Sequence, residues 1–256
     1  MNGMNKKCYK TLEYTKIIDR LTDFASSPLG KEKCQNLEPS RDLKEIRHWQ
    51  KETSDALARL WKKGAVSFSG TRDIRSSLKR LEIGSTLSAK ELLDISSVLN
   101  VALRIKPLAK VSDKEDSEEY EDSLAEMFTS LEPLSPLNNE LKRCIVSEEE
   151  MADDASANLS AIRRSIRATN DKIHNVINSM VNSSTVRTYL QDNVVTMRNG
   201  RYCLPVKAEY KSSMPGMIHD QSSTGSTIFI EPMSVVQMNN ELSELSIKEQ
   251  REIEKI

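Results

Sequence analysis

The order of apolar and polar positions predicts helices over most of the chain. Apolar residues recur three or four positions apart within Thr11–Ala25, Asp42–Lys63 and Ser88–Lys110, which is the spacing of one face of an amphipathic helix. Ser27 followed by Pro28 predicts a further helix start, because proline is favoured in a first helical turn. We expect these apolar stripes to face a core, so that residues 1–150 form a helical bundle.

Two longer apolar repeats flank a segment of a different kind. Residues 155–184 carry apolar side chains at the spacing of a coiled coil, with polar Thr169 or Asn170 at one step, and Met233–Ile256 repeats the pattern. We therefore predict an outgoing helix in 151–190 and a returning helix in 233–256, antiparallel to each other; thirty helical residues reach ~45 Å. The second repeat meets no stop signal before Ile256, so we expect the natural chain to continue.

The intervening residues, 191–232, predict a small β domain. Asn199-Gly200 lies between two β-rich runs, and this pair is a strong hairpin signal because both residues must adopt positive φ. A two-residue loop places Arg198 opposite Arg201, Met197 opposite Tyr202 and Val195 opposite Leu204. Two further strands are predicted, separated by turns; they cover Met217–Gln221 and Ser226–Glu231.

This register predicts one apolar and one basic face. The apolar face would carry Val195, Met197, Tyr202, Leu204 and Val206, and the other face would carry Arg198, Arg201 and Lys207 beside Thr196 and Cys203. Like charges directly opposite each other are destabilising, so an arginine pair at a hairpin end favours an anionic partner. The alternative is a solvated polar face. The hydroxyl-rich turn Ser222–Ser226 also suits phosphate contact.

Composition excludes several classes of protein. Of the 256 residues, 38% are apolar and 29% charged, and the apolar runs are too short to span a bilayer. Nothing at the amino terminus resembles a secretory signal, so the four separated cysteines predict reduced thiols in a cytoplasmic protein. The three histidines lie near no cysteine at ligand spacing, which argues against a zinc site.

Charge is unevenly distributed although the net charge is only −1. Residues 1–111 contain 22 Lys and Arg against 13 Asp and Glu, whereas residues 112–154 contain 3 against 15. Segment 112–123 has almost no apolar residues and predicts a mobile acidic loop or a helix start.

No catalytic constellation is evident in the sequence. His219 beside Asp220 could serve acid–base chemistry, but no nucleophile is placed for it, and a hydrogen-bonded structural histidine is the simpler interpretation. Gly30-Lys31 lacks the remaining residues of a phosphate loop. We therefore predict no catalytic residue, no metal site and no cofactor-binding residue in these 256 positions.

Several blocks together resemble one family. The most specific are His219-Asp220-Gln221-Ser222 and Phe229-Ile230-Glu231-Pro232 in that order. They are accompanied by Arg201–Tyr210, Pro215–Met217, Gly225–Ile228 and Asn239–Leu242, and upstream by Leu12–Tyr14, Ser27–Gly30 and Leu37–Pro39. These blocks resemble the MutS family, and more closely its second bacterial branch, over nearly the whole chain.

The resemblance implies a mainly α fold in which 1–150 is a core domain, the helix pair is a lever, and 191–232 is a β clamp at its tip. It also implies a homodimeric ATPase that uses ATP and Mg, with a possible Smr endonuclease domain, both beyond Ile256. The implied partners are branched DNA in suppression of recombination, or ribosomal RNA in rescue of collided ribosomes. A mismatch-repair subunit is a further alternative. Two observations argue against it: the chain begins directly in core helices, without the mismatch-reading domain and its Phe-x-Glu wedge, and the Phe229-Ile230-Glu231 sequence lies at a strand end. We expect Phe229 to pack in a core there.

The expected nucleic-acid contacts are basic residues of the clamp and the outgoing helix. They are Arg198, Arg201, Lys207 and Lys211, with Arg187, Arg163, Arg164 and Arg167 behind them. Four neutralised phosphates predict a log–log salt slope of about −3 to −4. The alternative for the arginines of the outgoing helix is that they lie on the solvent-exposed side of the coiled coil and contact only water. For the whole chain, the alternative is a helical scaffold whose coiled coil binds another protein.

We predict that the 256-residue chain by itself neither hydrolyses ATP nor nicks DNA, because its sequence contains no phosphate loop and no catalytic constellation. Phosphate release and plasmid nicking by a rigorously purified sample measure this directly. Turnover that co-purifies with the chain through orthogonal columns contradicts it.

Overall fold

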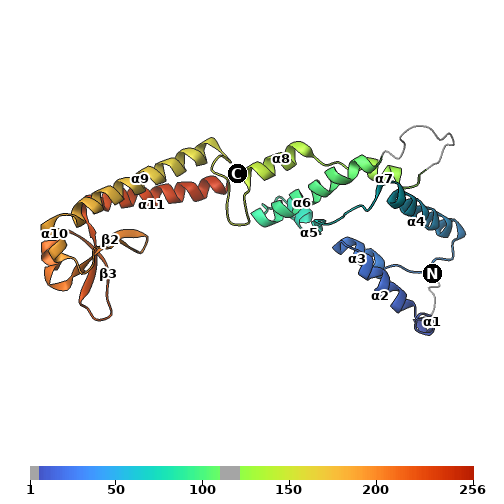
Figure 1. The fold of residues 1–256 in the computed structure, drawn as a ribbon, viewed down its shortest axis with the longest axis horizontal. Helices are drawn as coiled ribbons and strands as arrows, with labels where there is room; N and C mark the ends of the chain where they lie inside the picture. Colours follow the sequence, from blue (N-terminus) through green and yellow to red (C-terminus); the bar gives the residue numbers. More distant parts are fainter. Residues whose placement is uncertain (1–5, 110–121) are drawn as a thin grey trace. The chain divides into compact units, whose positions relative to one another are not determined.

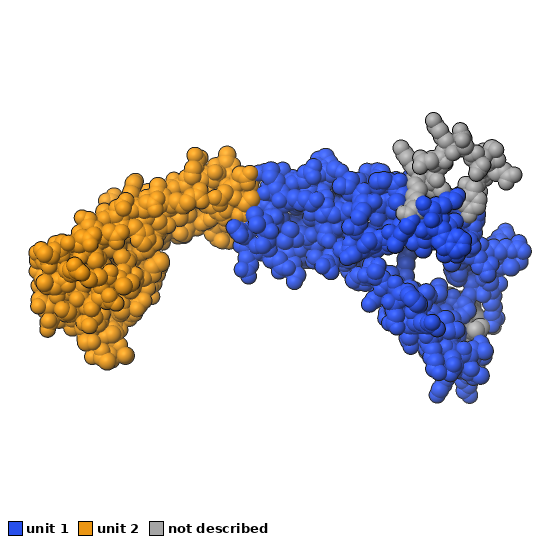
Figure 2. Space-filling model, in the orientation of Figure 1, with its two compact units in different colours: residues 1–150 blue, residues 151–256 orange. Residues whose placement is uncertain are grey.

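The protein is described by a computed structural model that covers residues 6–109 and 122–256 and divides into two units, Met1–Glu150 and Met151–Ile256 (Figure 2). Helices predominate, and the strands form one four-stranded antiparallel sheet (Figure 1). The mainly α fold class is thereby confirmed. Most of the acidic segment 112–123 lies outside the described residues. No helix in the described ranges is both long and apolar enough to cross a membrane.

Unit 1 is helical throughout its described residues. Its elements are α1 Lys6–Thr11, α2 Tyr14–Phe24, α3 Pro28–Gln35, α4 Leu43–Lys63, α5 Arg75–Glu82, α6 Ala89–Ile105, the 3-10 helix η1 Lys106–Ala109, α7 Ala125–Thr129 and α8 Ser135–Cys144. The predicted starts of α3 and α6 are confirmed: the Ser27 hydroxyl accepts from the Gly30 N–H, and Ser88 and Glu91 form a reciprocal capping box. Gly64 ends α4 with a φ of 81°.

The prediction of one continuous helix over Thr11–Ala25 is wrong. Glu13 adopts a φ of 52°, which breaks the chain into α1 and α2. The rings of Tyr9 and Tyr14 stack across the break with centroids 5.1 Å apart. The three- and four-residue spacing of apolar side chains therefore continues across the turn at Glu13. Such spacing alone does not show where one helix ends and the next begins.

The prediction that each apolar stripe of unit 1 faces a core is also wrong for many side chains. Ile18, Leu99 and Ile105 are buried, but Ile17 is largely exposed and Phe24 is 78% exposed. The closest helix contacts of this unit join α1, α2 and α3 in one group and α6, η1, α7 and α8 in another. Helices that meet in such small groups cover only part of each stripe.

Unit 2 is built on two long helices that pack side by side in opposite directions, α9 Ala157–Val181 and α11 Met233–Ile253 (Figure 1). Ser156 and Asn158 at the start of α9 hydrogen-bond Glu252 at the end of α11, and Met180 meets Ser234 at the opposite end. The apolar seam is buried, and Thr169 takes the predicted polar step with 2% exposure.

The remaining elements of unit 2 form what we call the β tip, residues 184–232. Its elements are α10 Ser184–Tyr189, β1 Thr196–Arg198, β2 Arg201–Lys207, the 3-10 helix η2 Ala208–Ser213, β3 Gly216–Gln221 and β4 Thr227–Pro232. The strand order is β1-β2-β4-β3, with every pair antiparallel. The predicted outgoing helix over 151–190 is not continuous: α9 ends at Val181 and α10 is a separate short helix, and the sequence did not predict η2.

The predicted hairpin is confirmed in its turn and its first two pairs. Asn199 and Gly200 have φ of 51° and 74°, and Arg198 faces Arg201 while Met197 faces Tyr202. The predicted pair of Val195 with Leu204 is wrong, because β1 begins at Thr196 and Leu204 pairs with Ile230 of β4.

The predicted division into an apolar and a basic face is wrong for β2. Cys203, Leu204 and Val206 are all fully buried, although Cys203 and Leu204 point to opposite faces, and Met197 is half exposed. Because neighbouring residues of a strand point to opposite faces, this burial means that the middle of β2 is covered on both faces of the sheet. Burial raises the pKa of the Cys203 thiol to about 11, so this cysteine remains a thiol at neutral pH.

Two isoleucines of the helix pair provide a matched test of this packing. Ile173 of α9 is fully buried, whereas Ile247 of α11 is about half exposed. We expect Ile173→Ala to lower the free energy of unfolding of unit 2 by about 2–5 kcal/mol and Ile247→Ala by less than about 0.5 kcal/mol. Urea unfolding followed through hydrogen exchange of segment 201–207 measures both. Equal losses would mean that the seam is not the core of this unit.

Candidate nucleic-acid interface

The eight basic residues predicted to contact nucleic acid all lie in unit 2, but in two separate places. Five belong to the β tip; they are Arg187, Arg198, Arg201, Lys207 and Lys211. Arg163, Arg164 and Arg167 lie in the first half of α9, beside the far end of α11. The 18 residues from Arg163 to Val181 correspond to roughly 27 Å of helix. The structure therefore does not bring the two sets together into one site.

Arg163 and Arg167 tie the base of the helix pair together. Arg163 Nε donates to Glu249 of α11 at 2.7 Å, and its Nη1 donates to Asp153 at 2.6 Å and to the Met151 carbonyl. Arg167 pairs with the other oxygen of Asp153 at 2.9 Å. Hydrogen bonds from Arg167 and Arg163 lower the pKa of Asp153. Of the three α9 arginines, only Arg164 is exposed without a carboxylate in its described contacts.

Arg201 is held by a buried carboxylate, that of Glu231 in β4. Glu231 is fully buried, and its Oε1 accepts from Arg201 Nη1 at 3.0 Å and from Asn239 Nδ2 at 2.7 Å. Its Oε2 contacts Nε2 of His219 in β3. Burial alone would raise the pKa of Glu231, but the hydrogen bonds from Asn239, His219 and Arg201 outweigh it and lower this pKa below its usual range. The carboxylate is therefore ionised, and Arg201 is its counter-ion.

This cluster extends to both long helices. The Asn239 side chain in α11 accepts from the Tyr202 N–H at 3.3 Å, and the Tyr202 hydroxyl donates to Asn170 of α9 at 2.9 Å. The ring of Tyr202 also meets His174 edge-on, with centroids 5.0 Å apart. The β tip is thus hydrogen-bonded to α9 and α11 through residues next to Arg201.

Arg198 is bound more loosely than Arg201. Its guanidinium lies over the Phe229 ring, 4.0 Å from the centroid, and its Nε is 3.1 Å from Asp220 Oδ2. Both members of this ion pair are partly exposed, so the pair contributes little to stability. Phe229 is only half buried beneath the arginine and is not part of the hydrophobic core cluster of unit 2, so its predicted packing in a core is not confirmed.

The other three tip residues belong to, or adjoin, two short helical elements that pack together through two tyrosines. Lys207 Nζ donates to the Thr188 carbonyl at 3.1 Å and lies 5.9 Å from the Tyr210 ring centroid. The rings of Tyr189 and Tyr210 are 5.0 Å apart, so α10 and η2 are neighbours. We call this surface the α10–η2 face; its basic residues are Arg187, Lys207 and Lys211, of which Arg187 and Lys211 are exposed.

The serine-rich turn between β3 and β4 is closed by its own hydroxyls. Ser222 Oγ accepts from the Thr227 N–H at 3.1 Å, and Thr224 and Ser226 hydroxyls are 2.8 Å apart. Gly225 adopts a φ of 75°, which suits glycine in the turn. A phosphate contact here stays a prediction.

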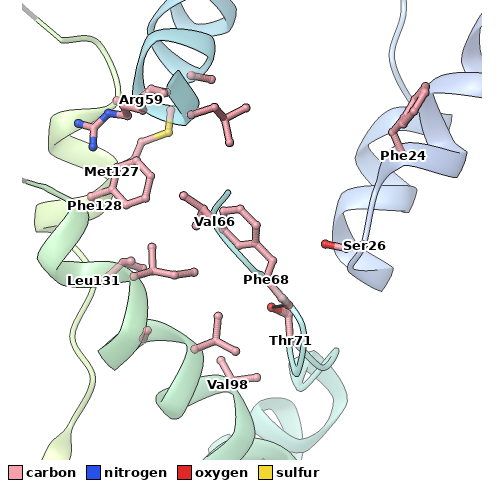
Figure 3. Close-up of a pocket in the computed structure, with 16 residues that line it drawn as sticks. Phe24, Ser26, Arg59, Val66, Phe68, Thr71, Val98, Met127, Phe128 and Leu131 are labelled. Atoms are coloured by element: carbon pink, nitrogen blue, oxygen red, sulfur yellow. Dashed lines mark hydrogen bonds between the residues drawn. The ribbon is translucent and has the colours of Figure 1, made fainter. Parts of the chain in front are cut away.

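Two other features concern His219 and an apolar cavity of unit 1. His219 contacts Glu231 and not Asp220, which confirms the structural interpretation of this histidine. Unit 1 contains an apolar cavity of about 690 Å³ between α2, α4, α6 and α7, lined by residues such as Phe24, Phe68 and Met127 (Figure 3). Among its described lining residues Arg59 alone is charged, and it lies over the Phe128 ring. The described residues contain no group of three His, Cys, Asp or Glu placed to hold a metal ion.

Sequence reasoning missed the partners of the two hairpin arginines. The direct partners are Asp220, Phe229 and Glu231, and Glu231 in turn contacts His219 and Asn239; these five residues come from β3, β4 and α11. The available signal was the His-Asp-Gln-Ser and Phe-Ile-Glu-Pro blocks, which contain four of these five residues. Local spacing could not show that these blocks lie against the hairpin.

Comparison with known proteins gives a consistent result. The chain is 57% identical over 255 residues to a protein of Lachnoclostridium phytofermentans, 58% over 253 residues to one of Agathobacter rectalis, and 51% over 253 residues to one of Lachnospira eligens. All three are named Endonuclease MutS2. Each match covers 99% of this chain but only 31–32% of the relative, so the chain spans about a third of their length. No protein-family model matches the chain.

We expect Glu231→Gln to destabilise unit 2 by about 3–5 kcal/mol at neutral pH, because it leaves Arg201 without its buried counter-ion. Because the folded pKa of Glu231 is lowered, its ionisation stabilises the fold above the usual glutamate range, near about 4.3, and this stabilisation is lost as the pH falls through the folded value. The variant should lack this pH-dependent part of the unfolding free energy.

The control is Glu241→Gln on an exposed position of α11, which removes the same charge. Urea unfolding of both variants between neutral pH and acid pH provides the comparison. A wild-type pH profile unchanged by Glu231→Gln would show that the carboxylate is not the ionised centre of the cluster.

Proposed function

This chain belongs to the MutS2 family, and from that premise we propose that its β tip binds the phosphate backbone of nucleic acid without reading base sequence. The relatives are named endonucleases, and an endonuclease must hold the backbone that it cuts. Phosphate contacts fix position and carry no direct sequence information, so a cluster of basic side chains is sufficient for this role.

The observation that carries the proposal is the α10–η2 face. Arg187 of α10 and Lys211 of η2 are exposed, and Lys207 joins these two elements by donating to the Thr188 carbonyl and lying near the Tyr210 ring. Arg201 and Arg163, in contrast, are occupied by Glu231 and Glu249. Three phosphates neutralised by this face give a salt slope of about −3 on B-DNA.

The finer mechanism extends the same proposal. The helix pair α9 and α11 acts as a lever, and the β tip is the clamp that it moves. A homodimeric ATPase that uses ATP and Mg would move this lever, and it would lie in the part of the relatives that this chain does not span. Residues of the present chain would bind and orient the polyanion, and cleavage would belong to the endonuclease part of the whole protein.

The target presents closely spaced phosphates on a structured nucleic acid. Branched DNA and the ribosomal RNA of stalled or collided ribosomes both have this chemistry, so the proposal covers recombination suppression and ribosome rescue in the cytoplasm alike. A mismatch-reading role is not part of it, since Phe229 is a strand residue stacked beneath Arg198.

A protein-binding scaffold is the second candidate, favoured by exposed apolar side chains of unit 1. Trp61 is 81% exposed and Ile83 is 79% exposed. This candidate predicts no salt-sensitive binding of nucleic acid by unit 2, so one experiment separates the two.

We expect the double change Arg187→Gln with Lys211→Gln to weaken binding of a labelled DNA duplex and a labelled RNA hairpin by about 10- to 50-fold at about 0.15 M salt. The reason is the loss of two phosphate contacts, which should also reduce the magnitude of the salt slope by about 2. Fluorescence anisotropy over a salt series measures affinity and slope together.

The matched control is Lys248→Gln with Arg251→Gln, which removes one lysine and one arginine from exposed positions near the far end of α11. It has the same net charge and should leave the salt slope almost unchanged. Equal effects of the two double variants, or no effect of either, would reject the α10–η2 face as the contact surface.

A further inference from the structure

The β1–β2 hairpin folds across the sheet to reach the opposite edge strand. Although β1 and β3 lie at the two ends of the strand order, Asn199 Nδ2 donates to the His219 carbonyl of β3 at 3.3 Å. Arg198, next to this turn, stacks on Phe229 of β4 and pairs with Asp220 of β3. One arginine thereby bridges three strands, on a part of the tip where its side chain is 37% exposed.

The chemistry of the arginine–aspartate contact suggests what it is for. A guanidinium binds carboxylate and phosphate with the same donor edges, and arginine stacked on an aromatic ring keeps those edges in a fixed plane. Arg198 Nη1 already donates to the Met197 carbonyl at 2.9 Å, while Nε faces the Asp220 carboxylate. Asp220 therefore occupies a donor edge that a phosphate oxygen could use.

We infer that Arg198 is a phosphate-binding residue whose donor edge is covered by Asp220 in the free protein, and that a nucleic-acid phosphodiester displaces this carboxylate. The inference rests on the proposed function and adds to it a competing group, Asp220, that sets how readily the tip accepts its ligand. Asp220 acts as an autoinhibitory contact: its charge occupies the arginine and repels an incoming anion.

The neighbouring arginine shows why the exchange is confined to Arg198. Arg201 is bound to Glu231, whose side chain is 0% exposed and accepts from Asn239 as well, so this carboxylate cannot leave. The Asp220 side chain is 49% exposed, and its Oδ1 accepts from the Gln221 N–H at 2.8 Å, so Oδ2 can exchange Arg198 for water while the carboxylate keeps this backbone contact. Phe229 remains beneath Arg198 throughout and preserves the orientation of its guanidinium.

The test is Asp220→Asn in the full 256-residue chain, with affinity measured by anisotropy on the labelled DNA duplex and RNA hairpin at fixed salt. We expect binding to tighten about two- to fivefold, the range that an exposed ion pair can supply. Arg198→Gln should weaken binding, and Arg198→Gln with Asp220→Asn should match Arg198→Gln alone, because Asp220 acts only through Arg198. Asp220→Ser is the second variant if the amide disturbs folding.

Asp171→Asn, on an exposed position of α9, removes the same charge away from the hairpin and should change affinity less than Asp220→Asn. Unchanged or weaker binding by Asp220→Asn overturns the inference, as does tightening that persists without Arg198. Inorganic phosphate is a second probe: tightening for phosphate but not for the nucleic acids assigns Arg198 to a free anion and also overturns it.

The two proposals fail in different ways. If Arg187→Gln with Lys211→Gln weakens binding while Asp220→Asn does not tighten it, the proposed function stands and this inference falls. If the Arg187 and Lys211 changes are also without effect on binding, the proposed function itself is rejected.

Discussion

The ionised carboxylate of Glu231 is the interaction on which the β tip depends. It is fully buried, yet three donors from different elements meet on its two oxygens: Arg201 from β2, His219 from β3 and Asn239 from α11. A buried charge is tolerated only when such partners replace water, so the position of each element is coupled to the others. The same requirement explains why Arg201 is held against the sheet as the counter-ion of Glu231.

The basic residues of unit 2 differ in how far they are exposed and paired, and these differences follow from burial more than from position in the sequence. Arg163 and Arg201 are each paired with a carboxylate of a neighbouring element, Glu249 of α11 and Glu231 of β4, whereas Arg187 and Lys211 are exposed on short helices. Arg198 lies between these extremes, stacked on Phe229 and paired with a solvent-exposed aspartate. Equal formal charges thus have unequal availability to a polyanion.

Sequence pattern predicted what local chemistry determines and failed where distant contacts decide. Asn199-Gly200 determined the turn and the facing of Arg198 with Arg201, and the serine and glycine caps located α3, α4 and α6. The hairpin lies against β3 through contacts between residues far apart in the sequence, those of Asn199 with His219 and of Arg198 with Asp220. Spacing along the sequence does not show such contacts, so the partners of the hairpin arginines could not be predicted from it. Periodicity likewise marks an apolar stripe without showing how much of it a neighbour covers, as Phe24 demonstrates.

The junction between β4 and α11 has a mechanical consequence. Pro232 ends the strand and Met233 begins the helix, so no residue separates the two elements, and Asn239, about 1.7 turns into the helix, is bonded to the sheet again. A twist applied to the far end of α11 cannot be absorbed at this joint. It must turn the strand carrying Phe229 and Glu231, and with it the orientation of the guanidinium stacked above.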